Sequence, residues 1–251
     1  MVKRYLCIII CILIAVYASG QIINTESSRI RTDTTGWFGT VSAASSYLLN
    51  DNTLFSFDAN IHVEHKGKKQ LWLFLSNYHF ARGTGVNFAD EGYLHVRNNM
   101  AVTKMLKWEG FVQIQKNSIQ NIGDRLLVGT GPRFKLSDHK YFRMYVGTSV
   151  MWESETEKTD RTIQTNLLRS SNYVSFTVVL GDKGTLENTT YFQPSFGSFG
   201  DRRLLTDWRL RIKLYKKFSF TALLTYLYDS QPATDANRNI LRQVNGVSYT
   251  F

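Results

Sequence analysis

The chain of 251 residues has only two cysteines, three prolines and one long apolar run. Both cysteines, Cys7 and Cys11, lie in the first twenty residues, so the rest of the chain cannot form a disulfide. With so little proline and only 17 glycines, the composition excludes a collagen-like chain and argues against disorder. No second run approaches the ~20 apolar residues that a membrane-spanning helix needs, which excludes a helical membrane bundle.

The first twenty residues have the three parts of a secretory signal peptide. Lys3 and Arg4 precede an apolar run over residues 6–17, and small residues occupy positions 18–20. Because this run is too short to span a bilayer, we expect cleavage before Gln21 rather than a retained anchor. Cleavage would remove both cysteines and lower the formal charge from +10 to +8. A secreted chain without disulfides needs another source of stability, such as a large closed fold.

From Gly36 onward, apolar and polar residues alternate, which is the period of a strand with two different faces. Residues 208–214 carry Trp, Leu, Ile and Leu at one parity and Arg, Arg and Lys at the other. Residues 55–64 repeat the pattern with Phe, Phe, Ala, Ile and Val against Ser, Asp, Asn, His and Glu. No helical periodicity follows the signal peptide, so we predict that the mature chain is all-β.

Turn signals divide this region into about twelve strands of about ten residues or more, long enough to cross a membrane when tilted. They are expected at residues 36–48, 53–65, 69–80, 87–100, 105–117, 121–136, 140–154, 166–180, 185–197, 203–215, 217–228 and 239–251. Every second connection is tight, and the others include the two longest. This rhythm predicts a transmembrane antiparallel up-and-down β-barrel over residues 36–251, with its short turns in the periplasm. Residues 1–20 would be the signal peptide and residues 21–35 an N-terminal periplasmic segment.

The placement of aromatic residues favours a membrane barrel over a soluble β-sandwich, which would give the same alternation. Aromatics expected at the membrane interfaces are Trp72, Trp108, Trp152, Tyr226, Tyr228, Tyr249 and Phe251. The chain ends on alternate apolar residues up to Phe251, like the C-terminal signature by which the barrel-assembly machinery recognises its substrates. We therefore expect the outer membrane of a Gram-negative bacterium, with outer-membrane lipids and lipopolysaccharide as partners. The protein would be a monomer or a component of a membrane complex.

In such a barrel the charged face must line the lumen, since Arg or Lys facing lipid at the midplane costs ~2–4 kcal/mol. The basic residues predicted to face inward are Arg97, Lys107, Arg125, Arg133, Lys135, Arg143, Arg169, Arg209, Arg211, Lys213 and Arg242. The acidic ones are Asp58, Glu64, Glu91, Glu109, Glu153, Glu187 and Asp207. Either an open cationic path favours small anions, or interleaved ion pairs fill the lumen. Because most of these side chains are long, we expect a narrow or occluded lumen.

Catalytic, metal-binding and cofactor-binding patterns are weak. A mature chain without cysteine and with five scattered histidines predicts no metal site and no cofactor. Lipid hydrolysis, with His79 or His95 as the base, is the enzymatic alternative, but there is no Gly-x-Ser-x-Gly motif and no serine is paired recognisably with a histidine. We therefore expect no catalytic residues. Basic residues are spread strand by strand without a patch, so nucleic-acid binding is not expected either.

Several short stretches resemble one known family. They are residues 36–43 (GWFGTVSA), 50–53 (NDNT), 108–115 (WEGFVQIQ) and 124–133 (DRLLVGTGPR). Together they resemble the YdiY-like, salt-induced outer-membrane protein family (domain of unknown function 481), over about residues 36–251. The resemblance implies a monomeric outer-membrane barrel and transfers no catalytic residues. The prediction is a non-enzymatic outer-membrane barrel, structural or assembly-associated, with an anion-favouring channel and a lipid hydrolase as alternatives.

Overall fold

The computed structural model describes residues 22–26, 29, 34–49, 53–118, 120–157, 163–215 and 218–249. Within them the secondary structure consists of twelve strands. These are β1 (Gly36–Leu49), β2 (Thr53–Lys66), β3 (Gln70–Gly83), β4 (Val86–Ala101), β5 (Leu106–Asn117), β6 (Ile122–Asp138), β7 (Phe142–Glu157), β8 (Gln164–Val179), β9 (Gly184–Pro194), β10 (Arg202–Tyr215), β11 (Phe218–Asp229) and β12 (Asn239–Tyr249). In this part of the chain no helix is long and apolar enough to cross a membrane. The expected signal peptide and Phe251 lie outside the described residues.

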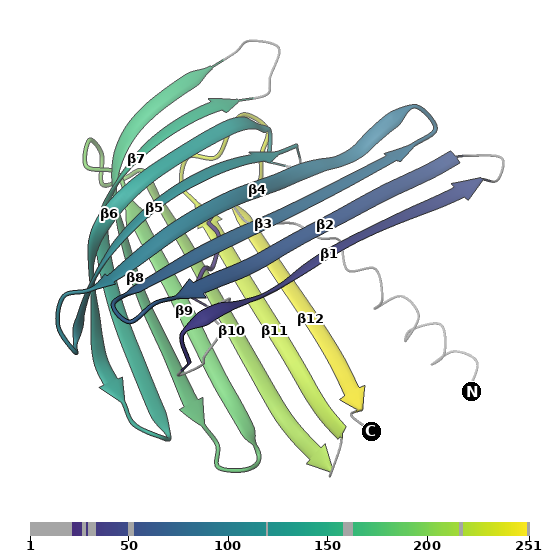
Figure 1. Ribbon diagram of the computed structural model, residues 1–251. Coiled ribbons are helices and arrows are strands. Elements are labelled where there is room, and N and C mark those ends of the chain that lie inside the picture. The colour runs from purple at the N-terminus through teal and green to yellow at the C-terminus, as the bar shows by residue number, and fades with distance from the viewer. Residues whose placement is uncertain are drawn as a thin grey trace.

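Each strand pairs antiparallel with the next one in sequence, so the sheet order is β1 to β12 (Figure 1). This confirms the predicted all-β, up-and-down architecture. The connections after β2, β4, β6, β8 and β10 are short and meet at one edge, which we call the short-turn rim. The opposite edge, the loop rim, holds the connections after β7, β9 and β11, which are the longest in the chain. The connections after β1, β3 and β5 at the loop rim are as tight as those at the short-turn rim.

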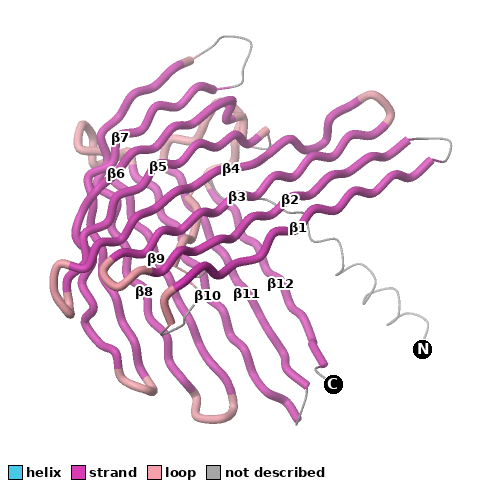
Figure 2. The backbone as a smooth tube through the Cα atoms, viewed as in Figure 1, coloured by secondary structure: helices cyan, strands magenta, loops and turns pink. Residues whose placement is uncertain are grey.

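The sheet curls strongly (Figure 2), and we call the space on its concave side the lumen. Side chains from strands that are not neighbours meet across this face. Arg203 of β10 reaches Glu153 of β7, and Tyr173 of β8 reaches Glu109 of β5. Such contacts three strands apart require the sheet to bend round on itself.

The two faces of the sheet are inverted relative to a soluble protein. On β5, the polar side chain of Gln113 is 4% exposed, while its apolar neighbours Val112 and Ile114 are 45% and 51% exposed. A soluble sandwich buries its apolar face, whereas a lipid-facing barrel exposes it. The alternation therefore has the phase of a membrane barrel.

The first and last strands diverge at the two ends of the curled sheet (Figure 1). Among the described residues, β1 pairs with β2 and β12 pairs with β11, and no pairing joins β1 to β12. The curl expected of a closed barrel is thus present without the hydrogen bonds that would seal it. In a bilayer these two edges must pair, since unpaired backbone groups in hydrocarbon are costly.

Candidate functional site

The concave face carries the charged residues predicted to line the lumen, and their exposure falls into three groups. Eight are buried: Arg97, Arg125, Arg133, Arg169, Glu64, Glu91, Glu109 and Glu153. Eight are partly buried: Lys107, Lys135, Arg143, Arg209, Arg242, Asp58, Glu187 and Asp207. Arg211 and Lys213, near the end of β10, are exposed. The lumen is therefore packed over part of its length and wider near the short-turn rim.

Toward the loop rim, three arginines and four carboxylates form a buried network that we call the Arg203 cluster. Its members are Arg125, Arg169, Arg203, Glu153, Glu155, Asp201 and Asp229. Arg203 lies at the centre, 2.5 Å from Glu153 and 2.8 Å from Asp229. Arg169 binds both oxygens of Asp201 at 2.9 Å, a bidentate pairing. Because these ions come from β6, β7, β8, β10, β11 and the β9–β10 connection, the cluster ties together half of the sheet.

Four members of this cluster were not among the predicted lumen residues. Arg203 has the same parity as Arg209 in β10, and extending the alternation backward would have found it. Glu155 and Asp229 were missed because β7 and β11 continue past the expected strand ends. Asp201 lies in a connection, where alternation gives no signal.

A second buried network, the Glu109 cluster, fills the middle of the lumen. Glu109 lies 3.0 Å from Arg29 and 3.2 Å from Arg97, and it accepts a hydrogen bond from the Tyr173 hydroxyl at 2.9 Å. Glu26 lies 2.8 Å from Arg29 and 2.7 Å from Arg133. Glu26 and Arg29 come from the segment before β1, so this segment is part of the network.

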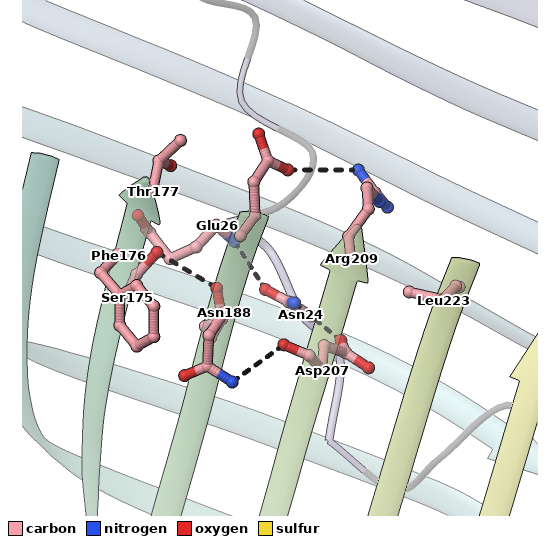
Figure 3. A pocket seen from close by; sticks show the side chains of 11 residues that line it. Asn24, Glu26, Ser175, Phe176, Thr177, Asn188, Asp207, Arg209 and Leu223 are labelled. Carbon is pink, nitrogen blue, oxygen red and sulfur yellow. Dashed lines mark hydrogen bonds and ion pairs between the residues drawn. The ribbon is translucent and has the colours of Figure 1, made fainter. Parts of the chain in front are cut away.

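The segment before β1 was expected in the periplasm, but part of it, residues 22–26 and Arg29, lies in the lumen. The side-chain amide of Asn24 donates to Asp207 at 2.7 Å, over β9 and β10 (Figure 3). Ile22 packs with Tyr191 and Leu205 in a small buried apolar cluster. Sequence alone could not place this segment, because it has no alternation and its ion-pair partners on the strands lie more than 75 residues away.

Neighbouring charged groups, most of them on the strands, shift the pKa values of Glu26 and Arg29. Burial alone would raise the pKa of Glu26, but the guanidinium groups of Arg133, Arg29 and Arg97 outweigh it and hold that pKa at about 2. Burial alone would lower the pKa of Arg29, but the carboxylates of Glu26 and Glu109 raise it overall. Both residues are therefore ionised at neutral pH, and each stabilises the ionised form of the other.

Aromatic rings lying over glycines narrow the middle of the lumen further. A Cβ atom at Gly147 would overlap the ring of Tyr173, and one at Gly129 would overlap the ring of Phe111. The Arg97 guanidinium stacks 4.9 Å from the centre of the Phe111 ring, a cation–π contact. The absence of side chains at these two glycines lets large rings lie flat across the concave face.

At the short-turn rim the lumen widens into a cavity of about 500 Å³, which we call the basic vestibule. The described cations that line it are Arg29, Lys66, Lys68, Lys69, Lys107, Arg133, Lys135 and Arg143. Its described carboxylates are Glu26 and Asp138. Lys66, Lys68 and Lys69, at the β2–β3 turn, were not predicted because sequence reasoning treated turns only as connections. The vestibule is therefore lined both by predicted lumen residues and by turn residues, for which the alternation makes no prediction.

The described aromatics among those predicted at the interfaces lie on the outer face. Trp72 and Trp108 are 39% and 45% exposed and stand near the start of β3 and β5, at the short-turn rim. Trp152, on β7, is 40% exposed, and Tyr249, near the end of β12, is 53% exposed. The Trp108 indole donates to Thr130 on the neighbouring strand at 2.8 Å. Partly exposed aromatics near the strand ends suit the interfacial belt of a membrane.

Tyr226 and Tyr228 are partly buried near the end of β11, at the loop rim. The Tyr226 hydroxyl donates to the Asn239 side chain at 2.8 Å, which fixes its orientation across the β11–β12 pair.

The two histidines considered as bases differ in their surroundings. His95 is 1% exposed, with its ring nitrogens 2.9 Å from Gln113 and 3.3 Å from Arg97. Both nitrogens are thus engaged without a serine. His79 Nδ1 lies 2.7 Å from Asp58, a pairing that fixes the imidazole orientation. Within the described residues, no group of three or more His, Cys, Asp or Glu side chains could hold a metal ion.

Comparison with known proteins assigns the chain to a family. The NanC porin is 11% identical, with a TM-score of 0.47, and the match covers 78% of this chain and 94% of the porin. The translocator domain of autotransporter NalP from Neisseria meningitidis is 12% identical, with a TM-score of 0.46, covering 87% of this chain and 90% of the domain. No curated protein matches the sequence. The model of a protein family described as "Protein of unknown function, DUF481" matches residues 41–251, which confirms the resemblance found in the sequence. The chain belongs to the DUF481 family.

Proposed function

We propose that this protein is a non-enzymatic outer-membrane β-barrel of a Gram-negative bacterium whose lumen is occluded, with a structural or assembly-associated role. The outward apolar side chains, the aromatics near strand ends and the polar concave face support a position in a bilayer. The short-turn rim would face the periplasm, as in barrels with short periplasmic turns.

The segment before β1 carries the argument for occlusion. Glu26 is buried and Arg29 is mostly buried in the Glu109 cluster, where each has an ion partner on a strand. Arg97, Glu109 and Tyr173 reach toward the same point from β4, β5 and β8. A solute would have to displace both the segment and these paired charges, and separating buried ion pairs is costly.

Planar-bilayer recordings test occlusion directly. We expect the wild-type protein to show no steady conductance above background. The double variant Glu26→Gln/Arg29→Gln, which neutralises the segment, should open the lumen and raise channel activity at least about tenfold. The matched control is Glu187→Gln/Arg209→Gln, which neutralises a half-exposed pair on the same face. Steady open channels in the wild type would overturn occlusion.

A channel favouring small anions is the second candidate, and the basic vestibule favours it. Reversal potentials under a salt gradient would test this candidate in the opened variant. Preference for cations, or no preference, would exclude an anion channel.

The non-enzymatic part of the proposal rests on His95. His95 has both ring nitrogens engaged by Gln113 and Arg97, and a general base needs one nitrogen within reach of its nucleophile. We expect purified protein to leave phospholipid and lipid A intact. Turnover that disappears in His79→Ala or His95→Ala would instead establish the lipid hydrolase.

We further propose outer-membrane lipids, lipopolysaccharide and the barrel-assembly machinery as partners, the last through Phe251. Deleting Phe251 should abolish the heat-modifiable gel migration of the folded barrel in cells. Unchanged migration would exclude that role of Phe251.

A further inference from the structure

We propose that the basic vestibule is a binding site for a small soluble multivalent oxyanion, carrying phosphate or carboxylate groups, that enters from the short-turn rim. The inference rests on the proposed function only for the side of the membrane that this rim faces. It assigns a class of ligand to the vestibule, a cavity that the proposed occlusion of the lumen does not explain.

Charge balance is the first observation. Among the described residues lining the vestibule, eight cations face two carboxylates. Five of these cations have no salt bridge to a described residue: Lys66, Lys68, Lys69, Lys107 and Arg143. By contrast, every arginine of the Arg203 cluster has a carboxylate partner. The vestibule therefore has an excess of positive charge that the described residues do not neutralise.

The strand register makes this excess costly. Lys107 of β5 lies directly opposite Arg133 of β6, on the same concave face. Like charges at directly opposite positions of an antiparallel pair repel each other. Arg133 is held by Glu26 and Glu109, but Lys107 has no such partner among the described residues. An anion bound between the two side chains would relieve the repulsion.

Two buried hydrogen-bond donors without an acceptor among the described residues indicate that a ligand in the vestibule supplies one. The Nε atoms of Arg133 and Arg143 are buried and have no hydrogen-bond acceptor among the described residues. Both side chains line the vestibule, on β6 and β7. Buried guanidinium donors normally have a partner, and carboxylate or phosphate oxygens match their geometry best.

The size of the cavity sets the scale of the ligand. A volume of about 500 Å³ lies within the range of small-molecule sites. Lysines at the β2–β3 turn and arginines on β6 and β7 surround it from different directions, so one monovalent anion could not reach all of them. The vestibule thus fits an anion with several separated charges.

Isothermal titration of the purified full-length protein in a neutral detergent tests the site. The probes are sodium tripolyphosphate, citrate and sodium chloride, all at low ionic strength. We expect one tripolyphosphate or citrate per chain, with affinity falling as salt is added, and no saturable binding of chloride. The relative affinities of tripolyphosphate and citrate distinguish a phosphate from a carboxylate ligand.

The variant Lys107→Gln/Arg143→Gln should weaken binding at least about tenfold, since it removes two cations that have no salt bridge to a described residue from the vestibule wall. The control Arg211→Gln/Lys213→Gln removes the same charge from exposed positions near the same rim but outside the vestibule, and should change affinity less than about twofold. Equal weakening by both pairs, or no saturable binding in the wild type, would overturn the site.

Two further measurements distinguish a soluble anion from a lipid headgroup, and the vestibule site from occlusion of the lumen. In nanodiscs, loss of tripolyphosphate binding when phosphatidylglycerol replaces phosphatidylcholine would show a lipid headgroup as ligand and overturn the soluble anion. Conductance is recorded on the same wild-type sample. Absent binding with no conductance refutes the vestibule site alone, whereas intact binding with steady conductance refutes occlusion alone.

Discussion

The Arg203 cluster and the basic vestibule occupy opposite ends of one lumen, and the same alternation turns arginines inward at both. In the Arg203 cluster, three arginines meet four buried carboxylates from several strands. In the vestibule, eight cations meet two carboxylates around an open cavity. An inward arginine is therefore structural where carboxylates from distant strands reach it, and available to a ligand where they do not.

Removing Arg203, the centre of the Arg203 cluster, should have the largest effect on stability. Arg203→Met removes the ion partner of Asp229 and leaves two arginines, Arg125 and Arg169, to balance the four carboxylates of the cluster. Breaking a buried pair in this way costs about 3–5 kcal/mol. Urea unfolding in micelles, followed by tryptophan fluorescence, would measure the loss. Arg202→Met, at the exposed neighbouring position, is the control and should leave the midpoint unchanged. Equal midpoints for the two variants would show that the cluster does not hold the sheet together.

Acid should release the segment before β1 from the lumen. The expected effect is smaller than that of Arg203→Met. The pKa of Glu26 is about 2, below its ordinary value of 4.5, so its ionised form stabilises the bound segment above pH 4.5. That stabilisation is lost as pH falls from about 4.5 toward about 2, when the carboxylate takes up a proton. A nitroxide label at Ile23→Cys should become mobile over this interval, as read by electron paramagnetic resonance.

The matched variant for this titration is Glu26→Gln, whose label mobility should not change over the same pH interval unless the whole barrel unfolds. Tryptophan fluorescence on the same samples reports global unfolding. A label that stays immobile at pH 2 in a folded barrel would contradict the assigned role of Glu26.

Removing one cation of the basic vestibule should have the smallest effect on stability, and the effect should be stabilising. Lys107→Gln relieves repulsion with Arg133, so the free energy of unfolding should rise slightly, by less than about 1 kcal/mol at low salt, and the gain should vanish at high salt. Lys116→Gln, which removes a half-exposed salt bridge to Asp90, should instead lose up to about 0.5 kcal/mol. A large loss in Lys107→Gln would mean that Lys107 is structural, and the contrast between the two ends would fail.

Much of the fold could be predicted from alternation alone, because the two faces of each strand meet different surroundings. All twelve strands lie within three residues of their expected ends, the largest differences being at Gly83, Glu157 and Pro194. The inward parity of Arg125, Arg133 and the other charged residues follows from the same rule, since charge on the lipid-facing side is costly.

Alternation could not show which inward charges meet. Arg203 and Glu153 are 50 residues apart and three strands apart, and only the curl of the sheet brings them to 2.5 Å. Glu26 and Arg29 precede the first strand, where no period exists, and their place is set by ion partners on β5 and β6. Asp201 shows the same limit, because it reaches Arg169 from a connection.

By itself, the sequence determined that this protein is all-β, that its strands run up and down, and which parity carries the charges, because a period of two is a local property of neighbouring residues. Only the tertiary structure decided that the segment before β1 lies in the lumen, that the middle is filled and that a basic cavity remains at one rim. These outcomes depend on distances between residues far apart in the chain, which the curvature of the sheet sets and which no local pattern records.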